Sequence, residues 1–486
     1  MSFIARFFGL DKANDKIFHL SKILTILLPI VSATISLSTT FFMIFVAEWA
    51  GGGDYIQGLT LMGVLIVIQM VVQTALDYPT GALGDYLGQR YIIASSFLSF
   101  SVAFLMVSFI NPTTPFWYVI AIYVMIGFAQ SQLSGAFNAW FDNNYRAAMP
   151  GDEDRKMYGV FWGKVGMMFQ VVATLALIPG SILAVVLGRG WVFQLQAVLG
   201  VIIAIVVLRY VTDFPEVREA RKERPSMSEY TAILKEGVNF LFSDRYVTYI
   251  ILGGCLVMSV GMVWGELILF PMYFSYLITD VAVSSFRTVL FVPGIFQAER
   301  SGVWSRRFEP KKWIPRFRLL QGTGLVFYLA FAAIMYFFPP ATVGVDMIML
   351  TFPYTQIVIM QLPVTSILPI LLMTITFTAT GIFGGFAEIL TQRELLDVIP
   401  NKIRNSMYSL SPTIGILFAI PLIATFGWLI PAAGFPLTMT LCGIISLIGA
   451  AMIAKGLSYP KPLANDIPQP TAQEPTEQIE QELAVE

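Results

Sequence analysis

Three charged side chains, Glu266, Arg287 and Glu388, lie within long apolar stretches of the sequence. A charge inside a bilayer costs several kcal/mol unless it is paired or faces water, so such residues are candidates for ion pairs or binding sites. Glu266 lies about five residues from the end of its stretch and Arg287 about eight from the start of the next, roughly 7 and 12 Å below the same surface. They could form a structural ion pair, or bind a solute or a proton, and Arg287 could also extend to the surface. Glu388 lies near the opposite surface, where a conformational latch is the better interpretation.

Uncharged polar residues recur at helical spacing in the same stretches. Ser36 and Thr40 are four residues apart, as are Thr374 and Thr378, so each pair would form a stripe on one face of a helix. Further side chains that could join these stripes are Asn138, Gln170 and Trp264. Stripes of Ser and Thr commonly tighten the packing between helices.

Several chemistries lack the residues that they need. The single histidine, His19, lies in an amphipathic N-terminal segment. The sequence therefore lacks the histidine ligands for zinc-dependent hydrolysis and the histidine base for acyl transfer. We therefore expect neither a metal nor a cofactor. No Walker phosphate-binding loop occurs, which excludes ATP as the energy source. Cys255 and Cys442 both fall within apolar stretches, which argues against a disulfide framework.

The composition is that of a protein with many membrane spans. Hydrophobic residues make up 56% of the chain and charged residues 13%, which is too little charge for a water-exposed surface. At about 20 residues per crossing, we predict an all-α bundle of twelve transmembrane helices, near residues 23–47, 57–80, 91–110, 116–141, 158–186, 191–211, 246–271, 279–298, 317–338, 366–390, 407–430 and 435–455.

The positive charges lie in alternate loops between these spans. An even number of spans places both termini on one side, and the loops on that side contain 28 of the 30 Lys and Arg residues, with only Arg189 and Arg287 elsewhere. The positive-inside rule therefore predicts a multi-pass protein of the cell membrane with both termini in the cytoplasm. The net charge of −1 does not indicate a nucleic-acid partner, because the basic residues face the anionic inner leaflet of the bilayer.

The longest polar interruption divides the spans into two sets of six. We predict an amphipathic segment, a first six-helix half, a cytoplasmic linker, a second half and a disordered tail at residues 1–22, 23–211, 212–245, 246–456 and 457–486. Between the ninth and tenth spans, residues 339–365 are apolar but contain Pro340, Pro353 and Pro363. We interpret this segment as an external loop on the membrane interface.

A short motif follows the second span, and an echo of it follows the eighth. The motif comprises Gly81, Asp85, Gly88 and Arg90, and the echo contains Gly302 and Arg306. The glycines permit a tight turn and a close approach of two helix ends, and the Asp85 carboxylate can accept hydrogen bonds from the free amides of a neighbouring helix N-terminus. Such a carboxylate would latch the inner ends of the helices together.

The motif resembles the loop signature of the major facilitator superfamily, Gly-x-x-x-Asp-Arg/Lys-x-Gly-Arg/Lys-Arg/Lys, although Tyr86 and Gln89 stand where basic residues are usual. The resemblance covers residues 20–456 and implies two pseudo-symmetric halves, with Arg90 paired to Asp142 at the end of the fourth span. It also implies that spans one, four, seven and ten line a central cavity. The polar stripes then become candidates for a weakly polar solute path.

The resemblance leads us to expect a secondary active transporter that moves a small solute by alternating access, as a monomer. Proton coupling would need a carboxylate that reaches the cavity and changes its protonation between the access states, and Glu266 is the best candidate. A facilitative uniporter and a multidrug efflux pump of the same fold are alternatives. An alternative of another class is an enzyme or sensor on a transporter-like scaffold, for which no pair of nucleophile and base is visible. The sequence identifies neither the solute, nor the direction, nor the coupling ion.

Overall fold

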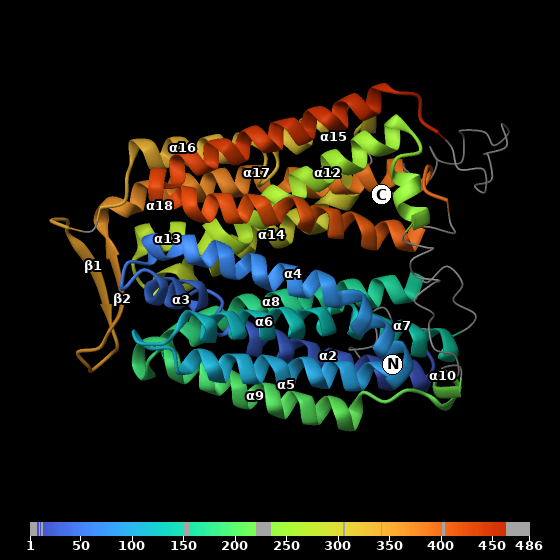
Figure 1. Ribbon diagram of the computed structural model, residues 1–486, viewed down its shortest axis with the longest axis horizontal. Coiled ribbons are helices and arrows are strands. Elements are labelled where there is room, and N and C mark those ends of the chain that lie inside the picture. The colour runs from blue at the N-terminus through green and yellow to red at the C-terminus, as the bar shows by residue number, and fades with distance from the viewer. Residues whose placement is uncertain are drawn as a thin grey trace.

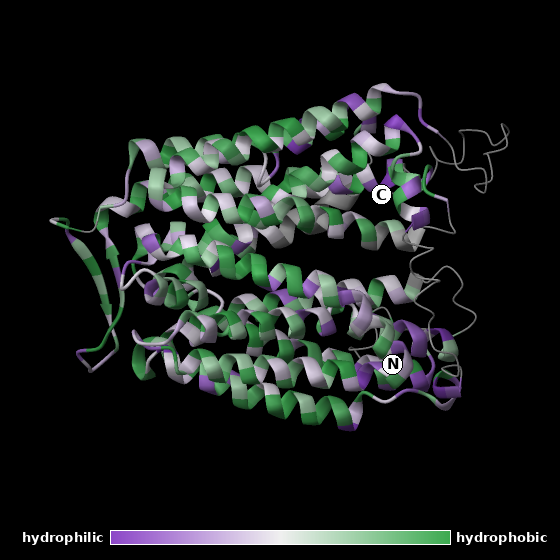
Figure 2. Cartoon of the chain, viewed as in Figure 1, coloured by the Kyte–Doolittle hydropathy of each residue, from purple (hydrophilic) through white to green (hydrophobic). Residues whose placement is uncertain are grey.

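The structure, a computed structural model, describes residues 7, 8, 10, 13–149, 156–219, 235–304, 307–341, 343–400 and 404–462. Long helices run side by side along one axis of the molecule (Figure 1). The start of α2 and the end of α18 lie at one end of this axis, the terminal end, and a β-hairpin lies at the other, the hairpin end (Figure 1). The helices are mostly hydrophobic along their length, and hydrophilic residues gather at the terminal end (Figure 2).

The helices fall into two sets, which we call the first and the second half. The first half consists of α2 (Asp15–Ser36), α3 (Phe42–Ala50), α4 (Tyr55–Leu87), α5 (Gln89–Ser108), α6 (Phe116–Leu133), α7 (Ala136–Ala148), α8 (Lys156–Leu187), α9 (Arg189–Tyr210) and α10 (Pro215–Glu219). The second half consists of α12 (Arg245–Val263), η2 (Trp264–Ile268), α13 (Leu269–Leu277), α14 (Asp280–Trp304), α15 (Pro310–Leu320), α16 (Leu325–Phe337), β1 (Met347–Thr351), β2 (Val358–Pro363), η4 (Val364–Ser366), α17 (Ile367–Leu396) and α18 (Arg404–Ser458).

The helices have the length and composition of membrane spans. Ten helical segments among the described residues are long and apolar enough to cross a bilayer. One of these, Leu410–Ser458, contains two helices that meet at Gly434, where φ is 82°, and α14 contributes 25 further helical residues to the bundle. The predicted all-α membrane fold is therefore present, whereas the exact number of twelve spans stays a prediction.

The first predicted span is not one continuous helix. It begins earlier than predicted, at Asp15, because the Asn14 side chain caps α2 by accepting a hydrogen bond from the Ile17 amide at 2.9 Å. It is interrupted after Ser36, and residues 37–41 form turns before α3. Ser36 and Thr40 therefore do not form the helical stripe that their spacing predicts. The interruption falls on Ser-Leu-Ser-Thr-Thr, whose hydroxyls compete for the backbone hydrogen bonds of a helix.

The segment predicted as an external loop forms an antiparallel hairpin of β1 and β2. Met347 pairs with Pro363 at the open end of the hairpin, and Pro353 lies in the turn between the strands. The prolines thus stand where a strand pair tolerates residues that lack an amide hydrogen, at its end and in its turn. The hairpin is anchored to the second half, since the Thr279 hydroxyl donates to the Gln361 carbonyl at 3.2 Å.

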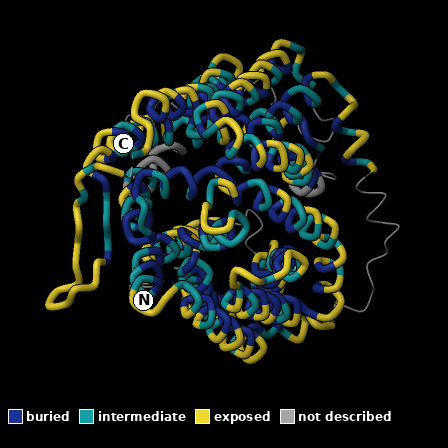
Figure 3. The backbone as a smooth tube through the Cα atoms, turned by 60° about the vertical axis from the view of Figure 1, so that its left-hand side comes forward, coloured by how far each residue is buried: buried dark blue, intermediate teal, exposed yellow. Residues whose placement is uncertain are grey.

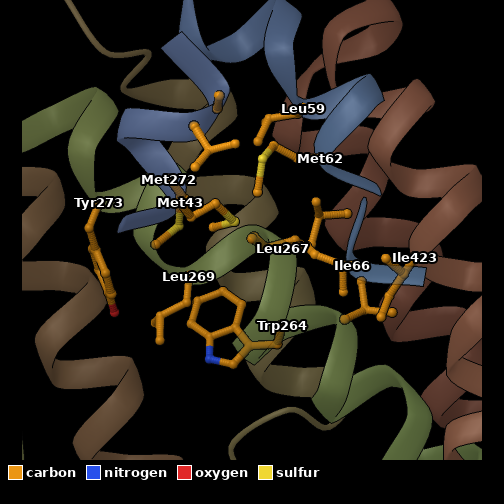
Figure 4. Packing of buried hydrophobic residues seen from close by; sticks show 14 of the residues in the cluster. Met43, Leu59, Met62, Ile66, Trp264, Leu267, Leu269, Met272, Tyr273 and Ile423 are labelled. Carbon is orange, nitrogen blue, oxygen red and sulfur yellow. The ribbon is translucent and has the colours of Figure 1, made fainter. Parts of the chain in front are cut away.

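The buried apolar residues form one shared core and two separate ones. The shared core, at the hairpin end, packs Met43, Leu59 and Met62 of the first half against Leu267 and Met272 of the second (Figure 4). Of the separate cores, one contains only residues between positions 8 and 211 and the other only residues between 241 and 457. Buried residues line the inside of each helix set, and exposed residues cover the outer faces (Figure 3). The apolar cores of the described residues are therefore shared at the hairpin end and separate at the terminal end.

Candidate functional site

Two adjacent cavities lie between the halves. The first has a volume of about 230 Å³, and the residues that line it include Ser36, Gln170 and Arg287. The second has a volume of about 260 Å³ and lies toward the hairpin end. Thr39 and Phe270 line both cavities. Each is smaller than the roughly 300–1,000 Å³ of sites for drug-sized ligands, so the space suits a small solute.

Arg287 places a positive charge in the first cavity. Its guanidinium carbon lies 5.9 Å from the centre of the Phe377 ring, within the range of a cation–π interaction. None of the ion pairs between described residues includes Arg287. The predicted pair with Glu266 is therefore not formed, and the two charges line different cavities.

Glu266 lies in the π turn η2, which separates α12 from α13. π turns inside α-helices frequently mark functional sites. Glu266 is exposed to the second cavity, which Gln69 and Gln130 of the first half also line. The Gln69 Nε2 atom donates to Gln130 Oε1 at 3.0 Å. The Glu266 carboxylate therefore faces a polar wall that the opposite half supplies.

An ion-pair cluster joins the halves at the hairpin end. Arg189 at the start of α9 donates two hydrogen bonds to the Asp280 carboxylate at the start of α14, at 2.8 and 2.9 Å, and a third to Glu48 at 2.6 Å. The Asp280 side chain is only 8% exposed. A bidentate Arg–carboxylate pair is one of the stronger polar contacts in proteins, so this cluster holds the two halves together at the hairpin end.

Two further contacts close the hairpin end. The hydroxyls of Thr40 and Ser284 lie 2.9 Å apart across the interface, and both residues are buried. In addition, Gly63 of α4 and Gly427 of α18 cross closely, because a Cβ atom built on Gly427 would lie 2.9 Å from the Gly63 Cα atom and 2.9 Å from the Leu59 carbonyl oxygen. Only glycine allows the two backbones to approach this closely.

The ion pairs of the described residues at the terminal end stay within one half. They join Lys16 to Glu216 in the first half, and Arg318 to Glu388 and Lys461 to both Glu394 and Asp397 in the second. Hydrogen bonds from its own backbone and from Lys16 hold the pKa of Glu216 below its usual range, so this pair remains charged at neutral pH. These described charges at the terminal end therefore brace each half rather than the junction between them.

The described contacts of the residues of the predicted latch are local ones. Asp85 accepts a hydrogen bond from Gln89 at 3.0 Å, one turn further along the chain. Arg90 contacts the ring and the hydroxyl of Tyr91, and Asp142 lies 2.8 Å from Arg146 in the same helix. An Arg90–Asp142 pair is not among the ion pairs of the described residues. Gly88 ends α4 with φ at 108°, as expected for a tight turn, whereas Gly81 has open space around its Cα atom.

Gly302 lies in the last turn of α14, and Arg306 lies outside the described residues.

The remaining predicted residues are distributed over several environments. Trp264 is buried in an aromatic cluster of the second half, with its ring centre 4.9 Å from that of Phe327, and is not among the residues that line the two central cavities. Asn138 lines a third, mostly apolar cavity of about 390 Å³ within the first half. Thr374 donates to the backbone of its own helix and, like Thr378, is not among the residues that line the two central cavities.

The Arg189 cluster was not among the predicted sites. Arg189 is one of only two basic residues outside the positive loops, which was the signal that could have found it. The predicted spans place Glu48, Arg189 and Asp280 near the ends of three different spans on the same side of the bilayer. Charges are scarce on that side, so three at similar depth were candidates for one cluster.

The sequence matches the family model for the Major Facilitator Superfamily over residues 24–368. The chain belongs to this superfamily. A search of curated proteins returned no match.

Solved structures of other major facilitator transporters resemble this chain in fold. The nucleoside transporter NupG is 11% identical, with a TM-score of 0.61 over 92% of this chain and 100% of that one. A bacterial homologue of the human lysosomal transporter Spinster, in an inward-facing and unoccupied conformation, is 14% identical, with a TM-score of 0.60 over 92% of this chain and 98% of that one. A D-xylose–proton symporter is 15% identical, with a TM-score of 0.56 over 91% and 98%. These likenesses confirm the predicted major facilitator fold.

The signature loop of this major facilitator protein provides a first test. Replacing Asp85 with alanine should slow turnover by about tenfold, the lower range for losing a hydrogen bond to a charged group, while expression stays unchanged. Turnover in proteoliposomes, normalised to inserted protein, measures the effect. Gln89→Ala is the matched control because it removes only the local Gln89–Asp85 bond. If both variants slow turnover equally, Asp85 acts within its own turn and does not latch another helix.

Proposed function

We propose that the protein moves a small solute across the membrane by alternating access, and that this structure represents the state closed at the hairpin end. The observation that supports this most is the core, which is shared between the halves at the hairpin end and separate at the terminal end. Halves that are joined at only one end can rock about the cavities between them and expose these to the other side. With both termini in the cytoplasm, as the charge pattern predicts, this state faces inward.

We further propose that transport is coupled to protons through Glu266, with uniport as the alternative. Support comes from the position of this carboxylate, which lines a cavity between the halves and has no ion-pair partner among the described residues. A carboxyl group whose hydration changes between the access states can bind a proton in one state and release it in the other. One chain builds both cavities and their closure, which supports a monomer as the transport unit.

Distances between the halves test the proposal. Spin labels at Thr113 and Phe337 report on the hairpin end, and labels at Leu87 and Leu396 report on the terminal end. The two native cysteines are buried, so they interfere little with labelling. In nanodiscs at two pH values, with solutes found by thermal-shift screening, the first distance should lengthen whenever the second shortens. If the spin-label distance at each end shows one unchanged distribution under all conditions, alternating access is contradicted.

Removal of the Arg189 charge should open the hairpin end. Arg189→Gln leaves the poorly exposed Asp280 carboxylate without its counter-charge, and a lost charged hydrogen bond of about 1.5–3 kcal/mol corresponds to a shift of roughly tenfold or more toward the open state. The Thr113–Phe337 spin-label distance measures this shift. Arg146→Gln is the control, since Arg146 pairs with Asp142 inside one helix. Identical distance distributions in both variants would show that the cluster does not hold the closed state.

A further inference from the structure

We propose that the solute is an organic anion with one acidic group, such as a carboxylate, on a small apolar body, and that Arg287 binds this group. The inference deepens the proposed transport function and rests on it. It concerns the first cavity, which has Arg287 on one side and aromatic side chains around it.

The first argument is the missing counter-charge. A guanidinium inside a protein is costly unless a carboxylate or comparable acceptors compensate it. None of the ion pairs between described residues includes Arg287, and its described ring partner is Phe377. Contact with an aromatic ring compensates only part of a desolvated charge. The described residues therefore supply no anion for this guanidinium, and a bound acid would complete the site.

The second argument is that the hydroxyls of the two neighbouring threonines donate to backbone carbonyls and make no hydrogen bond with Arg287. The Thr174 hydroxyl donates to the Gln170 carbonyl at 2.9 Å. The Thr288 hydroxyl donates to the Ser284 carbonyl at 2.9 Å and lies 3.3 Å from the Thr174 carbonyl. A hydroxyl that donates in this way can still accept a hydrogen bond, but no hydrogen bond between described residues joins Arg287 to Thr174 or Thr288. The Gln170 side chain, which is exposed to the same cavity, remains as a second polar contact for a bound acid.

The third argument is that Arg287 and Glu266 line different cavities. Glu266 lines the second cavity, together with Gln69, Gln130 and Tyr123, whereas Arg287 lines the first. A carboxylate solute at Arg287 would therefore leave Glu266 free to exchange a proton. One anion moved with one proton carries no net charge, so its movement would not be opposed by the membrane potential.

The shape of the site indicates the rest of the solute. Phe270, Phe291 and Phe377 provide apolar ring surface around Arg287, in a volume of about 230 Å³. An aromatic or short aliphatic acid would bury its body against these rings and place its acidic group on the guanidinium. Because Gln170 belongs to the first half and Arg287 to the second, the bound acid would contact both halves and could influence their rocking.

Matched sets of probes test the proposal on the wild-type protein. Each set contains an aryl or alkyl carboxylate, its neutral amide and the amine of the same carbon skeleton. Thermal-shift screening selects the most stabilising set, and isothermal titration gives its dissociation constants. The carboxylate should bind at least about tenfold more tightly than the amide, and the amine should not bind. Equal affinity for the carboxylate and the amide would overturn the proposal.

Variants locate the binding in the cavity. Arg287→Gln should weaken carboxylate binding by about tenfold or more, and Arg287→Lys, which keeps the charge, should weaken it less. Arg209→Gln, which removes an arginine from the last turn of α9, should leave it unchanged. Carboxylate binding that Arg287→Gln does not weaken would refute the assignment. If that variant does not fold, the comparison of acid and amide on the wild type decides alone.

The two proposals fail in different ways. If carboxylates bind through Arg287 but the spin-label distances at both ends never change, transport is refuted and the anion site is still supported. Suppose instead that a neutral or cationic solute changes the spin-label distances at the two ends in opposite directions and that carboxylates do not bind. This result would refute the anion site and would still support the proposal of transport.

Discussion

Glu266→Gln should abolish the accumulation of solute in response to a pH gradient, while exchange of labelled for unlabelled solute continues. Glutamine preserves the shape of the side chain and its contacts with the cavity wall near Gln69 and Gln130, but it cannot titrate. With one proton moved per solute, a gradient of one pH unit supports accumulation of at most about tenfold. The variant should therefore reduce the accumulation ratio from about ten to one.

The measurement uses proteoliposomes with an imposed pH gradient, and counterflow in the same vesicles shows that the variant still moves solute. Glu388→Gln is the matched control because Glu388 pairs with Arg318 inside the second half and lines neither central cavity. Its accumulation ratio should equal that of the wild type. If Glu266→Gln still concentrates solute, coupling resides elsewhere, and uniport or another coupling ion becomes the better explanation.

A large residue at Gly427 should prevent closure of the hairpin end. The Cβ atom of any substitution would lie 2.9 Å from the Gly63 Cα atom and from the Leu59 carbonyl oxygen, and neither is the movable end of a side chain. Overpacking of this kind costs about 1–3 kcal/mol, which corresponds to a shift of roughly 5- to 150-fold away from the closed state. Gly427→Leu should therefore populate mainly the opposite access state and transport slowly.

The Thr113–Phe337 spin-label distance and the initial rate of counterflow together measure this effect. Gly254→Leu is the matched control, because a Cβ atom on Gly254 has no neighbour within 4 Å. It should change neither quantity. If the Gly427→Leu variant closes like the wild type, the close approach of α4 and α18 at this glycine does not control closure of the hairpin end. The glycine crossing then contributes only to packing.

The sequence predicted best those properties to which many residues contribute. The fold class follows from long apolar stretches and from 28 basic residues in alternate loops, so no single exception changes the result. The superfamily followed from the spacing of Gly81, Asp85, Gly88 and Arg90, which is a local pattern. The depth estimates for Glu266 and Arg287 used only the rise per residue of a helix, and they did not show which side of its helix each residue occupies.

The properties that depend on distant contacts could not be predicted. Arg189 meets Asp280 across 91 residues and Glu48 across 141, and although its place outside the positive loops is unusual, its local sequence does not identify these partners. The interruption at residues 37–41 replaces a predicted helix despite a favourable hydropathy, and its Thr40 hydroxyl pairs with Ser284, 244 residues away in the chain. The β1–β2 hairpin was missed because its residues are as apolar as those of a span, and their pairing is specified only in three dimensions.

The π turn at Trp264–Ile268 gives the span Arg245–Leu277 a property that hydropathy does not measure. A π turn contains one residue more than an α turn, so it rotates the face of α13 by about 100° relative to that of α12. Deletion of one residue there would leave a segment that the translocon still inserts, because insertion depends on summed hydropathy. Met272 and Tyr273, which are now fully buried, would leave the shared core. We therefore expect a change of one residue in the length of this segment to leave membrane insertion unchanged and to disrupt closure of the hairpin end.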